Sequence, residues 1–454
     1  MGNTIFMGKR KLVVIGGDAA GMSAASKVRR THKEWEIVVF ERGQYTSYAA
    51  CGMPYYIAGM VESANHLIAR KPEDFRKKQN IDVRILHEVV KIDLDKKRVR
   101  VRNLEKESEF WECYDDLLIA TGASPVRPEV AGIDAKGIFG LSTLQSGLSV
   151  FDYMRDNRLK NAVIVGGGYI GIEMAEALLE RNMKVSLLDM APEVMNTLDP
   201  DMGKLISKYM REIGVDLYLN EKLDHFESKM SKVTGIITDK RTLDADLVIL
   251  GIGTKPNTSL ALKAGIVLGA NDAIRINKKM ETSVANIWAA GDCAESFHMV
   301  SKQQVNIALG TVANKHGLIA GENISGGNVE FPGVVGTAIT KIKDLEISRT
   351  GLNEKELKDL GIPYKTSTII SSTLPGYYPG AAEICVKLLI EKESGQLLGG
   401  QIVGKKGAAK RIDTLVTAIT ARMTVRDLAF LDLSYAPPFS PVWDPLQIAA
   451  RTFL

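Results

Sequence analysis

The sequence predicts an α/β protein that contains the same strand–turn–helix unit twice and ends in a separate C-terminal region. Residues 11–21 read Lys-Leu-Val-Val-Ile-Gly-Gly-Asp-Ala-Ala-Gly, and residues 161–171 read Asn-Ala-Val-Ile-Val-Gly-Gly-Gly-Tyr-Ile-Gly. In both, a short apolar run typical of a buried parallel strand meets a glycine turn, and a helix is expected next, over 22–30 and 172–181. The 454 residues exceed what one hydrophobic core usually holds, so about three domains are expected.

Both glycine turns have the spacing of a dinucleotide-binding fingerprint, in which a pyrophosphate rests on the N-terminus of the following helix. A β-like run follows each turn and ends in an acid, Glu41 after 37–40 and Asp189 after 185–188. The acids stand near the expected spacing, about 20 residues after the first glycine, for a carboxylate that binds ribose hydroxyls. The opposing interpretation is two βαβ units that bind nothing. The candidate cofactor contacts in the turns are Gly16, Gly17, Asp18, Ala19, Ala20 and Gly21 in the first and Gly166, Gly168, Tyr169, Ile170 and Gly171 in the second.

The two copies differ in ways that bear on what each binds. Asp18 takes the middle glycine position of the first fingerprint, and although Gly17 still permits the turn, the motif no longer secures the pyrophosphate contact there. The second copy is complete. Its Asp189 carboxylate would accept hydrogen bonds from a ribose 2′-hydroxyl and repel a 2′-phosphate, and residues 190–193 contain no arginine. NADH is therefore favoured over NADPH, which stays possible.

Three further segments complete the pattern of a dinucleotide-binding fold. Residues 286–290 read as a strand that ends in Gly-Asp, and a helix is expected over 306–319. Asp292 alone could be merely a helix cap, but Ile-Ala-Thr-Gly-Ala at 119–123 and Gly-Ile-Gly-Thr-Lys-Pro-Asn at 251–257 accompany it. The candidate contacts in these segments and after the first acid are Arg42, Thr121, Gly122, Gly253, Gly291 and Asp292.

One cysteine, Cys51, stands where redox chemistry is expected. It lies in Ser-Tyr-Ala-Ala-Cys-Gly-Met-Pro-Tyr-Tyr (47–56), and position 56, where a dithiol enzyme would carry its second sulfur, is tyrosine. A lone sulfur cannot close an internal disulfide there, so it must cycle through a mixed disulfide, a persulfide or a sulfenic acid. Pro54 suits the first turn of a helix, whose dipole is expected to stabilise the Cys51 thiolate. Ser47 is expected to hydrogen-bond the sulfur, and so contact the same cofactor site, or to cap that helix.

Composition and charge exclude several other classes of protein. Hydrophobic residues make up 45% of the chain and charged residues 25%, and the net charge of +4 is too small to indicate nucleic acid or a membrane surface as a partner. No apolar run approaches the roughly 20 residues that span a bilayer. The four cysteines lie far apart, in neither metal-ligand nor disulfide-scaffold spacing, so no metal is expected and a reducing cytoplasm is the simplest location. Cys113, Cys293 and Cys385 are expected to be buried small residues.

These motifs, in this order, resemble the two-dinucleotide-binding-domain flavoprotein disulfide reductases over essentially the whole chain. The resemblance implies two Rossmann-like domains, with a discontinuous FAD-binding domain over 9–122 and 254–328 and an NAD(P)H-binding domain over 123–253 inserted into it. Residues 329–454 would form an α+β dimerisation domain, and the glycine- and proline-rich stretch at 326–333 fits a boundary there.

Within that family, the string around Cys51 discriminates between branches. Dithiol members carry Cys-x4-Cys and a histidine near the C-terminus, whereas this chain has Tyr56 and no histidine after His316. Single-cysteine NADH oxidases and peroxidases have a histidine in the first glycine turn, which this chain lacks. Ser-x3-Cys-Gly-x-Pro-Tyr-Tyr and the string at 433–445 resemble instead the coenzyme A-disulfide reductases and the NADH-dependent persulfide, polysulfide and sulfur reductases. The alternatives are an NADH oxidase that works through a cysteine sulfenic acid, and a protein that passes electrons to a protein partner.

The resemblance also implies roles for individual residues. Glu41 would hold the adenosine half of FAD and Asp292 its ribityl or pyrophosphate region, while Glu173 would lie near the flavin and nicotinamide rather than only complement a helix dipole. Tyr169 would cover the nicotinamide pocket or simply pack. A homodimer would share its active site, with Tyr435 of one subunit protonating the thiolate that leaves the other. A second tyrosine would come from Tyr377 or Tyr378, a choice that the sequence leaves open beside the alternative of a turn without chemistry. Coenzyme A would be a substrate or a mixed-disulfide partner of Cys51.

Overall fold

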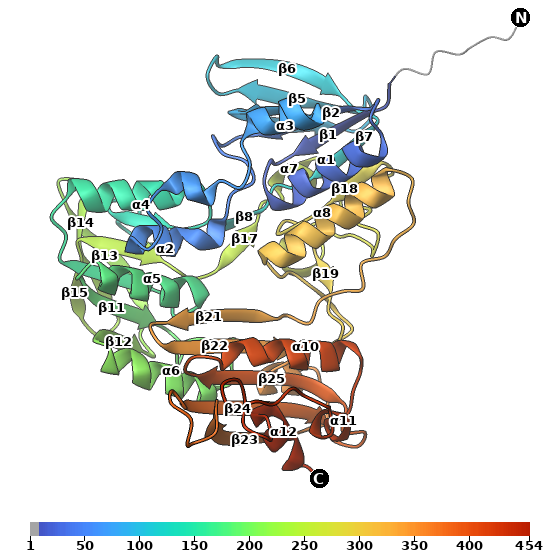
Figure 1. The fold of residues 1–454 in the computed structure, drawn as a ribbon. Coiled ribbons are helices and arrows are strands. Elements are labelled where there is room, and N and C mark those ends of the chain that lie inside the picture. Colours follow the sequence, from blue (N-terminus) through green and yellow to red (C-terminus); the bar gives the residue numbers. More distant parts are fainter. Residues whose placement is uncertain (1–8) are drawn as a thin grey trace, which may run out of the picture.

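The computed structural model describes residues 9–454, and its first domain is built on a parallel five-stranded sheet (Figure 1). The strand order is β18-β7-β1-β2-β3. In chain order, these strands are β1 (Lys11–Ile15), β2 (Glu36–Glu41), β3 (Asp82–Ile85), β7 (Asp116–Ile119) and β18 (Ile287–Ala289). Because β18 returns to this sheet after the second domain has been completed, the first domain is discontinuous. Two helices, α1 (Ala19–Thr31) and α8 (Gly310–Ile324), pack against each other beside it.

The second domain repeats this architecture within the insertion. Its parallel sheet has the order β12-β11-β10-β16-β9 and packs against α4 (Leu144–Asp156), α5 (Tyr169–Glu180) and α6 (Pro200–Glu212). The strands are β9 (Ile138–Gly140), β10 (Asn161–Val165), β11 (Lys184–Asp189), β12 (Val215–Leu219) and β16 (Leu247–Leu250). The chain enters this domain through β8 (Ala123–Pro125) and leaves through β17 (Thr254–Pro256), and these two strands pair antiparallel.

Each parallel sheet carries an antiparallel three-stranded sheet. The first consists of β4 (His87–Asp93), β5 (Arg98–Asn103) and β6 (Ser108–Cys113), and the second of β13 (Leu223–Lys229), β14 (Lys232–Thr238) and β15 (Thr242–Asp244). The shorter elements are η1 (Ala50–Gly52), α2 (Met53–Ala58), η2 (Ala64–Leu67), α3 (Pro72–Gln79), α7 (Ser259–Lys263), η3 (Ala270–Asp272), β19 (Ser296–Phe297) and β20 (Gln304–Val305). Among the residues described, no helix is long and apolar enough to cross a membrane.

The C-terminal domain is an antiparallel sheet with helices packed on it, at the bottom of Figure 1. The strand order is β21-β22-β25-β24-β23. The strands are β21 (Ala338–Ile342), β22 (Leu345–Gly351), β23 (Tyr364–Ser372), β24 (Glu383–Glu391) and β25 (Leu397–Gly404), and the helices are α9 (Glu354–Asp359), η4 (Ala409–Arg411), α10 (Ile412–Thr420), α11 (Val425–Ala429) and α12 (Pro445–Arg451). The predicted fold class, two Rossmann-like domains followed by an α+β domain, is therefore confirmed.

The first glycine of each fingerprint is required by sterics. Gly16 and Gly166 have φ of +106° and +104°, and a Cβ atom at either position would lie 2.1 Å from the Ala120 carbonyl oxygen or 2.5 Å from that of Gly251. The two helices begin three residues earlier than predicted, at Ala19 and Tyr169, because the last fingerprint glycine lies within the first helical turn. The helix expected over 306–319 is α8, which begins later and ends later, at Gly310 and Ile324.

A buried ion cluster joins the second domain to the C-terminal domain. The Lys387 ammonium of β24 lies 3.1 Å from Asp199 Oδ2, 2.8 Å from Asp201 Oδ1 and 2.6 Å from Glu354 Oε1. Burial acts to lower the pKa of Lys387, but the hydrogen bonds to Asp201 and Glu354 outweigh it and raise that pKa. The three carboxylates have the spacing of a metal site, and the ammonium supplies the positive charge that they need.

Candidate active site

The two fingerprint turns hold their acids in the same way. Glu41 accepts a hydrogen bond from the Gly17 amide through Oε2 and one from the Gly43 amide through Oε1, both at 2.7 Å. Asp189 accepts from the Gly167 amide at 2.6 Å and from the Ala191 amide at 2.8 Å. A carboxylate oxygen has two lone pairs, so each acid keeps acceptor capacity for a ribose hydroxyl after these bonds are made.

The environment of Asp292 fits a dinucleotide-binding site at the first sheet. It follows β18 at the carboxyl edge, and its Oδ1 atom is buried without a hydrogen-bond partner in the part of the chain that the structure describes. Burial raises the pKa of Asp292 to about 6. A buried polar atom without a partner is unfavourable, and a ribityl hydroxyl of FAD would satisfy it, so the residues present fit that cofactor.

Three further predicted contacts lie where the chain crosses between the domains: Thr121 and Gly122, predicted for FAD, and Gly253, predicted for NADH. Thr121 Oγ1 donates to the Asn257 carbonyl at 2.6 Å, and the Asn257 amide returns a bond to the Thr121 carbonyl at 2.9 Å. Gly122 and Gly253 adopt positive φ at the two crossings. A Cβ atom on Gly291 would lie 2.9 Å from that of Ala20, so Gly291 lets the two halves of the first domain pack closely. Arg42 is exposed.

Cys51 lies in η1, between the first glycine turn and α2, and is accessible to solvent. Surrounding protein atoms raise the pKa of its thiol, and the charge of Glu173 raises it further. Helix α2 begins two residues after the cysteine, at Met53, and has only six residues. Stabilisation of the thiolate by its dipole stays a prediction, which burial and the charge of Glu173 oppose.

Ser47 does not act as predicted. Helix α2 begins after Gly52 without a side-chain cap. Ser47 instead adopts φ of +47° and is held by its backbone, with its amide donating to the Gly17 carbonyl at 3.2 Å and its carbonyl accepting from Ala69 at 2.8 Å. The segment that leads to Cys51 is thus fastened to the first glycine turn.

No second sulfur accompanies Cys51 among residues 9–454. Tyr56 fills the corresponding place and packs against Phe151 in a tilted arrangement, with ring centroids 4.7 Å apart. All four cysteines are free thiols; Cys293 and Cys385 are buried, as predicted, whereas Cys113 lies exposed at the end of β6. The prediction for Cys113 failed because the outer face of that antiparallel sheet is open to solvent.

Glu173, the fifth residue of α5, lies near enough for its charge to act on Cys51. Thr340 of β21 donates a hydrogen bond from Oγ1 to Glu173 Oε1 at 2.9 Å. Burial, followed by repulsion from Glu176, raises the pKa of Glu173 against this bond. Tyr55, whose pKa is raised by burial and by the charges of Glu173 and Cys51, belongs to the same group. Sequence reasoning missed Tyr55 and Thr340, although Tyr55, one helical turn after the cysteine, could have been found from that spacing.

Tyr169 begins α5 beside the second glycine turn, and Ile170 and Gly171 continue that first turn. The Tyr169 hydroxyl is buried without a hydrogen-bond partner within 9–454, and burial raises its pKa. Packing and coverage of a nucleotide pocket are both compatible with this position. A Cβ atom on Gly171 would lie 2.0 Å from the Gly166 carbonyl oxygen, so this helix can approach its strand only with glycine there.

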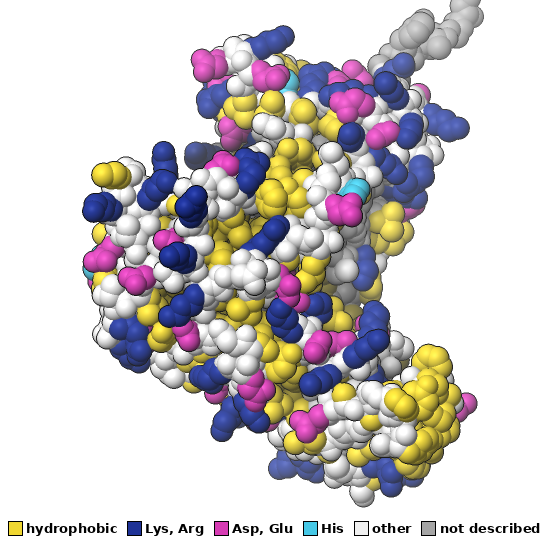
Figure 2. Space-filling model, turned by 60° about the vertical axis from the view of Figure 1, so that its left-hand side comes forward, with side chains coloured by type: hydrophobic (Ala, Val, Ile, Leu, Met, Phe, Trp, Pro, Cys, Tyr) yellow, Lys and Arg dark blue, Asp and Glu magenta, His cyan; other side chains and the backbone are white. Residues whose placement is uncertain are grey.

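Two tyrosines of the C-terminal domain form a pair on its surface. Tyr377 is 75% exposed and Tyr435 48%, and the nearby Tyr435 hydroxyl raises the pKa of Tyr377. Tyr378 is only half exposed and lies outside this pair. Figure 2 shows apolar side chains gathered on one end of this domain. The exposed large apolar residues of the domain's loops and helices are Tyr377, Phe430, Tyr435, Phe439, Val442 and Trp443.

A groove of about 480 Å³ opens beside the Cys51 segment. Ser47 and Tyr48 form one wall, and two exposed arginines, Arg30 of α1 and Arg70 before α3, lie along it. Neither arginine has an ion-pair partner among residues 9–454. The other residues that line it are Asp18, Ala19, Met22, Ser23, Ser26, Ala69, Phe75, Asn314 and Leu318.

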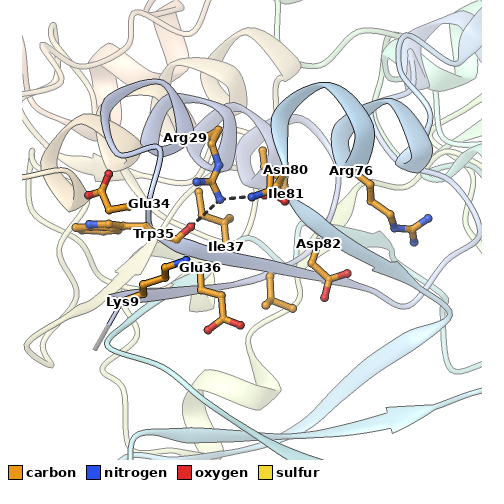
Figure 3. A pocket seen from close by; sticks show the side chains of 11 residues that line it. Lys9, Arg29, Glu34, Trp35, Glu36, Ile37, Arg76, Asn80, Ile81 and Asp82 are labelled. Carbon is orange, nitrogen blue, oxygen red and sulfur yellow. Dashed lines mark hydrogen bonds between the residues drawn. The ribbon is translucent and has the colours of Figure 1, made fainter. Parts of the chain in front are cut away.

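A second cavity, of about 390 Å³, lies at the opposite, amino-terminal end of the first sheet (Figure 3). Its buried cation, Arg29, donates to the carbonyl oxygens of His32, Lys33, Trp35 and Asn80. Since these bonds occupy the guanidinium, and since ligands of such sheets bind at the carboxyl ends of the strands, this cavity carries no chemistry.

Comparison with known families identifies both parts of the architecture. A family model described as pyridine nucleotide-disulphide oxidoreductase matches residues 10–317, and the dimerisation domain of such proteins matches residues 337–445.

Relatives and solved structures match over almost the whole chain. The NAD(P)H sulfur oxidoreductase (CoA-dependent) of Pyrococcus furiosus is 43% identical, over 98% of this chain and 99% of that protein. An NADH oxidase of Methanocaldococcus jannaschii is 38% identical, over 98% of each chain. The structure of an NAD-dependent persulfide reductase from A. fulgidus superposes with a TM-score of 0.95 and 39% identity, covering 98% of this chain and 82% of that one.

Proposed function

Because this chain belongs to the pyridine nucleotide-disulphide oxidoreductase family, we propose that it uses NADH to reduce disulfide or sulfane sulfur carried by coenzyme A. Electrons would pass through bound FAD to Cys51 as the single redox cysteine. The observation that carries this proposal is the position of one accessible thiol beside Glu173 of the second domain, with Tyr56 in place of a second sulfur. The four free thiols suit a reducing compartment.

The first domain would hold FAD and the second NADH. Gly16, Gly21 and Glu41 would bind the adenosine and pyrophosphate part of FAD and Asp292 its ribityl chain, while Asp189 would bind the NADH ribose. When bound, FAD supplies the relay of two electrons from NADH to a disulfide. The chain's own task is to hold these groups and to present the Cys51 sulfur to the substrate.

The sulfur chemistry would take place at Cys51. Its thiolate attacks the outer sulfur bond of R–S–S–R′, forms a Cys51–S–S–R mixed disulfide and releases R′–S⁻, which takes up a proton. NADH, which supplies two electrons and one proton, would then return Cys51 to the thiolate, release R–SH and leave as NAD⁺. Overall, NADH, a proton and R–S–S–R′ give NAD⁺, R–SH and R′–SH. Because the protein raises the pKa of the Cys51 thiol, protonation of Glu173 or a nearby cofactor must help to form the thiolate.

Mass spectrometry of the purified protein tests this proposal. We expect an adduct with the mass of coenzyme A on Cys51, released by reductant and absent from Cys51→Ser, because a mixed disulfide is the resting state of a single-thiol cycle. An oxygen-sized adduct at Cys51 would contradict it and favour an NADH oxidase that works through a sulfenic acid, the activity that the Methanocaldococcus relative is named for.

The groove beside Cys51 supports coenzyme A as the carrier. Its two arginines, which have no ion-pair partner among residues 9–454, suit the phosphates of a nucleotide, and its wall includes Ser47 and Tyr48, which precede the cysteine in the chain. A second group of basic residues, Lys405, Lys406, Lys410 and Arg411, is less suited to bind these phosphates. The reason is that Arg411 forms an ion pair with Asp444 at 2.8 Å.

Replacing both groove arginines tests this assignment. We expect Arg30→Met with Arg70→Met to raise KM for coenzyme A substrates by about thirtyfold to several hundredfold, since each of the two lost charge-assisted bonds contributes roughly 1–2 kcal/mol, and to change kcat little. Steady-state kinetics with a coenzyme A disulfide and with inorganic polysulfide would separate the effects, because polysulfide has no phosphate. Arg211→Met, an exposed arginine of α6, is the control. An equal rise in KM for both substrates would contradict this role.

A second copy of the chain would complete the site. The family match to the dimerisation domain and the exposed apolar side chains around Tyr377 and Tyr435 support a homodimer. We propose that Tyr377 and Tyr435 reach the partner's Cys51 and protonate the leaving thiolate. Tyr377 rather than Tyr378 is the second member, because Tyr435 acts on the pKa of Tyr377 and Tyr377 is the more exposed of the two.

Hybrid dimers test whether the tyrosines act across the interface. Tyr377→Phe is expected to lower kcat about tenfold or more, because it removes a general acid, and Tyr378→Phe is the matched control. Mixing Cys51→Ser subunits with subunits that carry Tyr377→Phe and Tyr435→Phe should restore activity, since one site of each hybrid then has both intact groups. No recovery in verified hybrids would mean that each subunit uses its own tyrosines.

A further inference from the structure

Asp18 stands at the position where the fingerprint has its middle glycine, and its surroundings give it a partner. It caps the start of α1 in an extended conformation, φ −109° and ψ −151°, which any residue adopts. Its Oδ1 atom accepts a hydrogen bond from the amide of Tyr48 at 3.2 Å. Tyr48 lies three residues before Cys51 and forms part of the groove wall.

The second fingerprint provides an internal comparison. There, Met195 has φ of +53° and its amide donates to the Gly167 carbonyl at 2.8 Å, just as Ser47 has φ of +47° and donates to the Gly17 carbonyl. In both copies, therefore, a residue with positive φ donates a backbone hydrogen bond to the second glycine of the turn. In the first copy, the amide of the next residue, Tyr48, also donates a hydrogen bond to the Asp18 side chain. Gly168, at the matching position of the second copy, has no side chain that could accept such a bond.

This hydrogen bond, which we call the Asp18–Tyr48 anchor, occurs in the copy that is followed by Cys51. Burial, together with the charges of Glu41 and Asp292, raises the pKa of Asp18 to about 6, and the hydrogen bond from the Tyr48 amide opposes this increase. A glycine or alanine at this position would avoid burying a carboxyl group near two other acids. The hydrogen bond from the Tyr48 amide partly offsets the cost of that burial. A carboxyl group accepts this bond in either protonation state.

We propose that Asp18 is a positioning residue for Cys51, holding the Tyr48 backbone against the first glycine turn so that the thiol keeps its place beside the cofactor site. This rests on the proposed redox function of Cys51. Misplacement of a reacting group by about 1 Å can lower a rate about a hundredfold. Because Tyr48 is only three residues before Cys51, a less ordered backbone at Tyr48 would also displace the sulfur.

Three substitutions in the full-length, FAD-loaded protein test the proposal. Asp18→Asn keeps an acceptor oxygen, Asp18→Ala removes it, and Asp18→Gly restores the fingerprint. Hydrogen exchange of peptides that contain Tyr48 is expected to accelerate in the alanine and glycine variants and to stay at the wild-type rate in the asparagine variant. The second readout is kcat for coenzyme A disulfide divided by kcat for ferricyanide, an acceptor that needs no thiol. This ratio should fall about tenfold or more for alanine and glycine and recover with asparagine.

The outcomes separate this proposal from the function on which it rests. Unchanged exchange at Tyr48 in Asp18→Ala, or failure of Asp18→Asn to restore the ratio, would overturn the positioning role. Loss of FAD from Asp18→Gly, measured by the ratio of flavin to protein absorbance, would also overturn it, because Asp18 would then serve the cofactor. If Cys51→Ser kept the wild-type ratio, the proposed function itself would fail, whatever the exchange at Tyr48.

Discussion

Cys51→Ser should lower the reduction of coenzyme A disulfide or persulfide by NADH at least about a thousandfold, because a serine hydroxyl cannot replace the thiolate as nucleophile. The structure offers no substitute, since the other thiols described lie in the core or on β6, and Tyr56 occupies the place of a second sulfur. Steady-state consumption of NADH at saturating disulfide measures the effect.

Cys113→Ser is the matched control for this experiment, because Cys113 is an exposed thiol on a different sheet. It should retain wild-type activity with the same disulfide. If Cys51→Ser kept more than about a tenth of the wild-type rate, the electrons would reach the acceptor without a covalent thiol intermediate. The oxidase interpretation would then have to be tested by measuring oxygen consumption in the same variant.

Gly166→Ala is expected to remove NADH binding while FAD stays bound. The added Cβ atom would lie 2.5 Å from the Gly251 carbonyl oxygen and 2.6 Å from its carbon, in a backbone conformation with φ of +104° that alanine rarely adopts. The strain alone is of order 1–3 kcal/mol, and relief of the clash would open the turn on which the pyrophosphate rests. Equilibrium titration with NADH should show Kd raised about a hundredfold or more, since two such penalties of roughly 1.4 kcal/mol each correspond to that factor.

The two fingerprints allow a reciprocal control. Gly16→Ala places its Cβ atom 2.1 Å from the Ala120 carbonyl oxygen and should reduce the FAD content of the purified protein instead. Gly310→Ala, at the start of α8 with open space around the new methyl group, should affect neither cofactor. Equal loss of both cofactors from Gly16→Ala and Gly166→Ala would contradict independent sites and would indicate that either change unfolds the chain as a whole.

The fold and the two dinucleotide sites could be predicted because their signals are local. A glycine at position 16 or 166, the acid at 41 or 189 and the apolar runs between them lie within a single βαβ unit, where backbone geometry follows from residue type. The same holds for the single thiol, since the absence of a cysteine at position 56 is visible in the sequence. The predicted helix starts were late by three residues, because the fingerprint itself lies partly inside the helix.

The sequence by itself therefore determined the fold class, the two glycine fingerprints, the acids that accept hydrogen bonds from the turns and the lone cysteine. Tertiary structure alone decided the surroundings of that cysteine, such as the bond of Thr340 to Glu173, 167 positions away, and the anchor from Asp18 to Tyr48. It also brought Tyr435 near enough to raise the pKa of Tyr377, and it raised the pKa of Cys51 through burial and the charge of Glu173. The physical reason is that burial, charge and hydrogen bonding at a site sum contributions from segments that meet only when the domains have folded against one another.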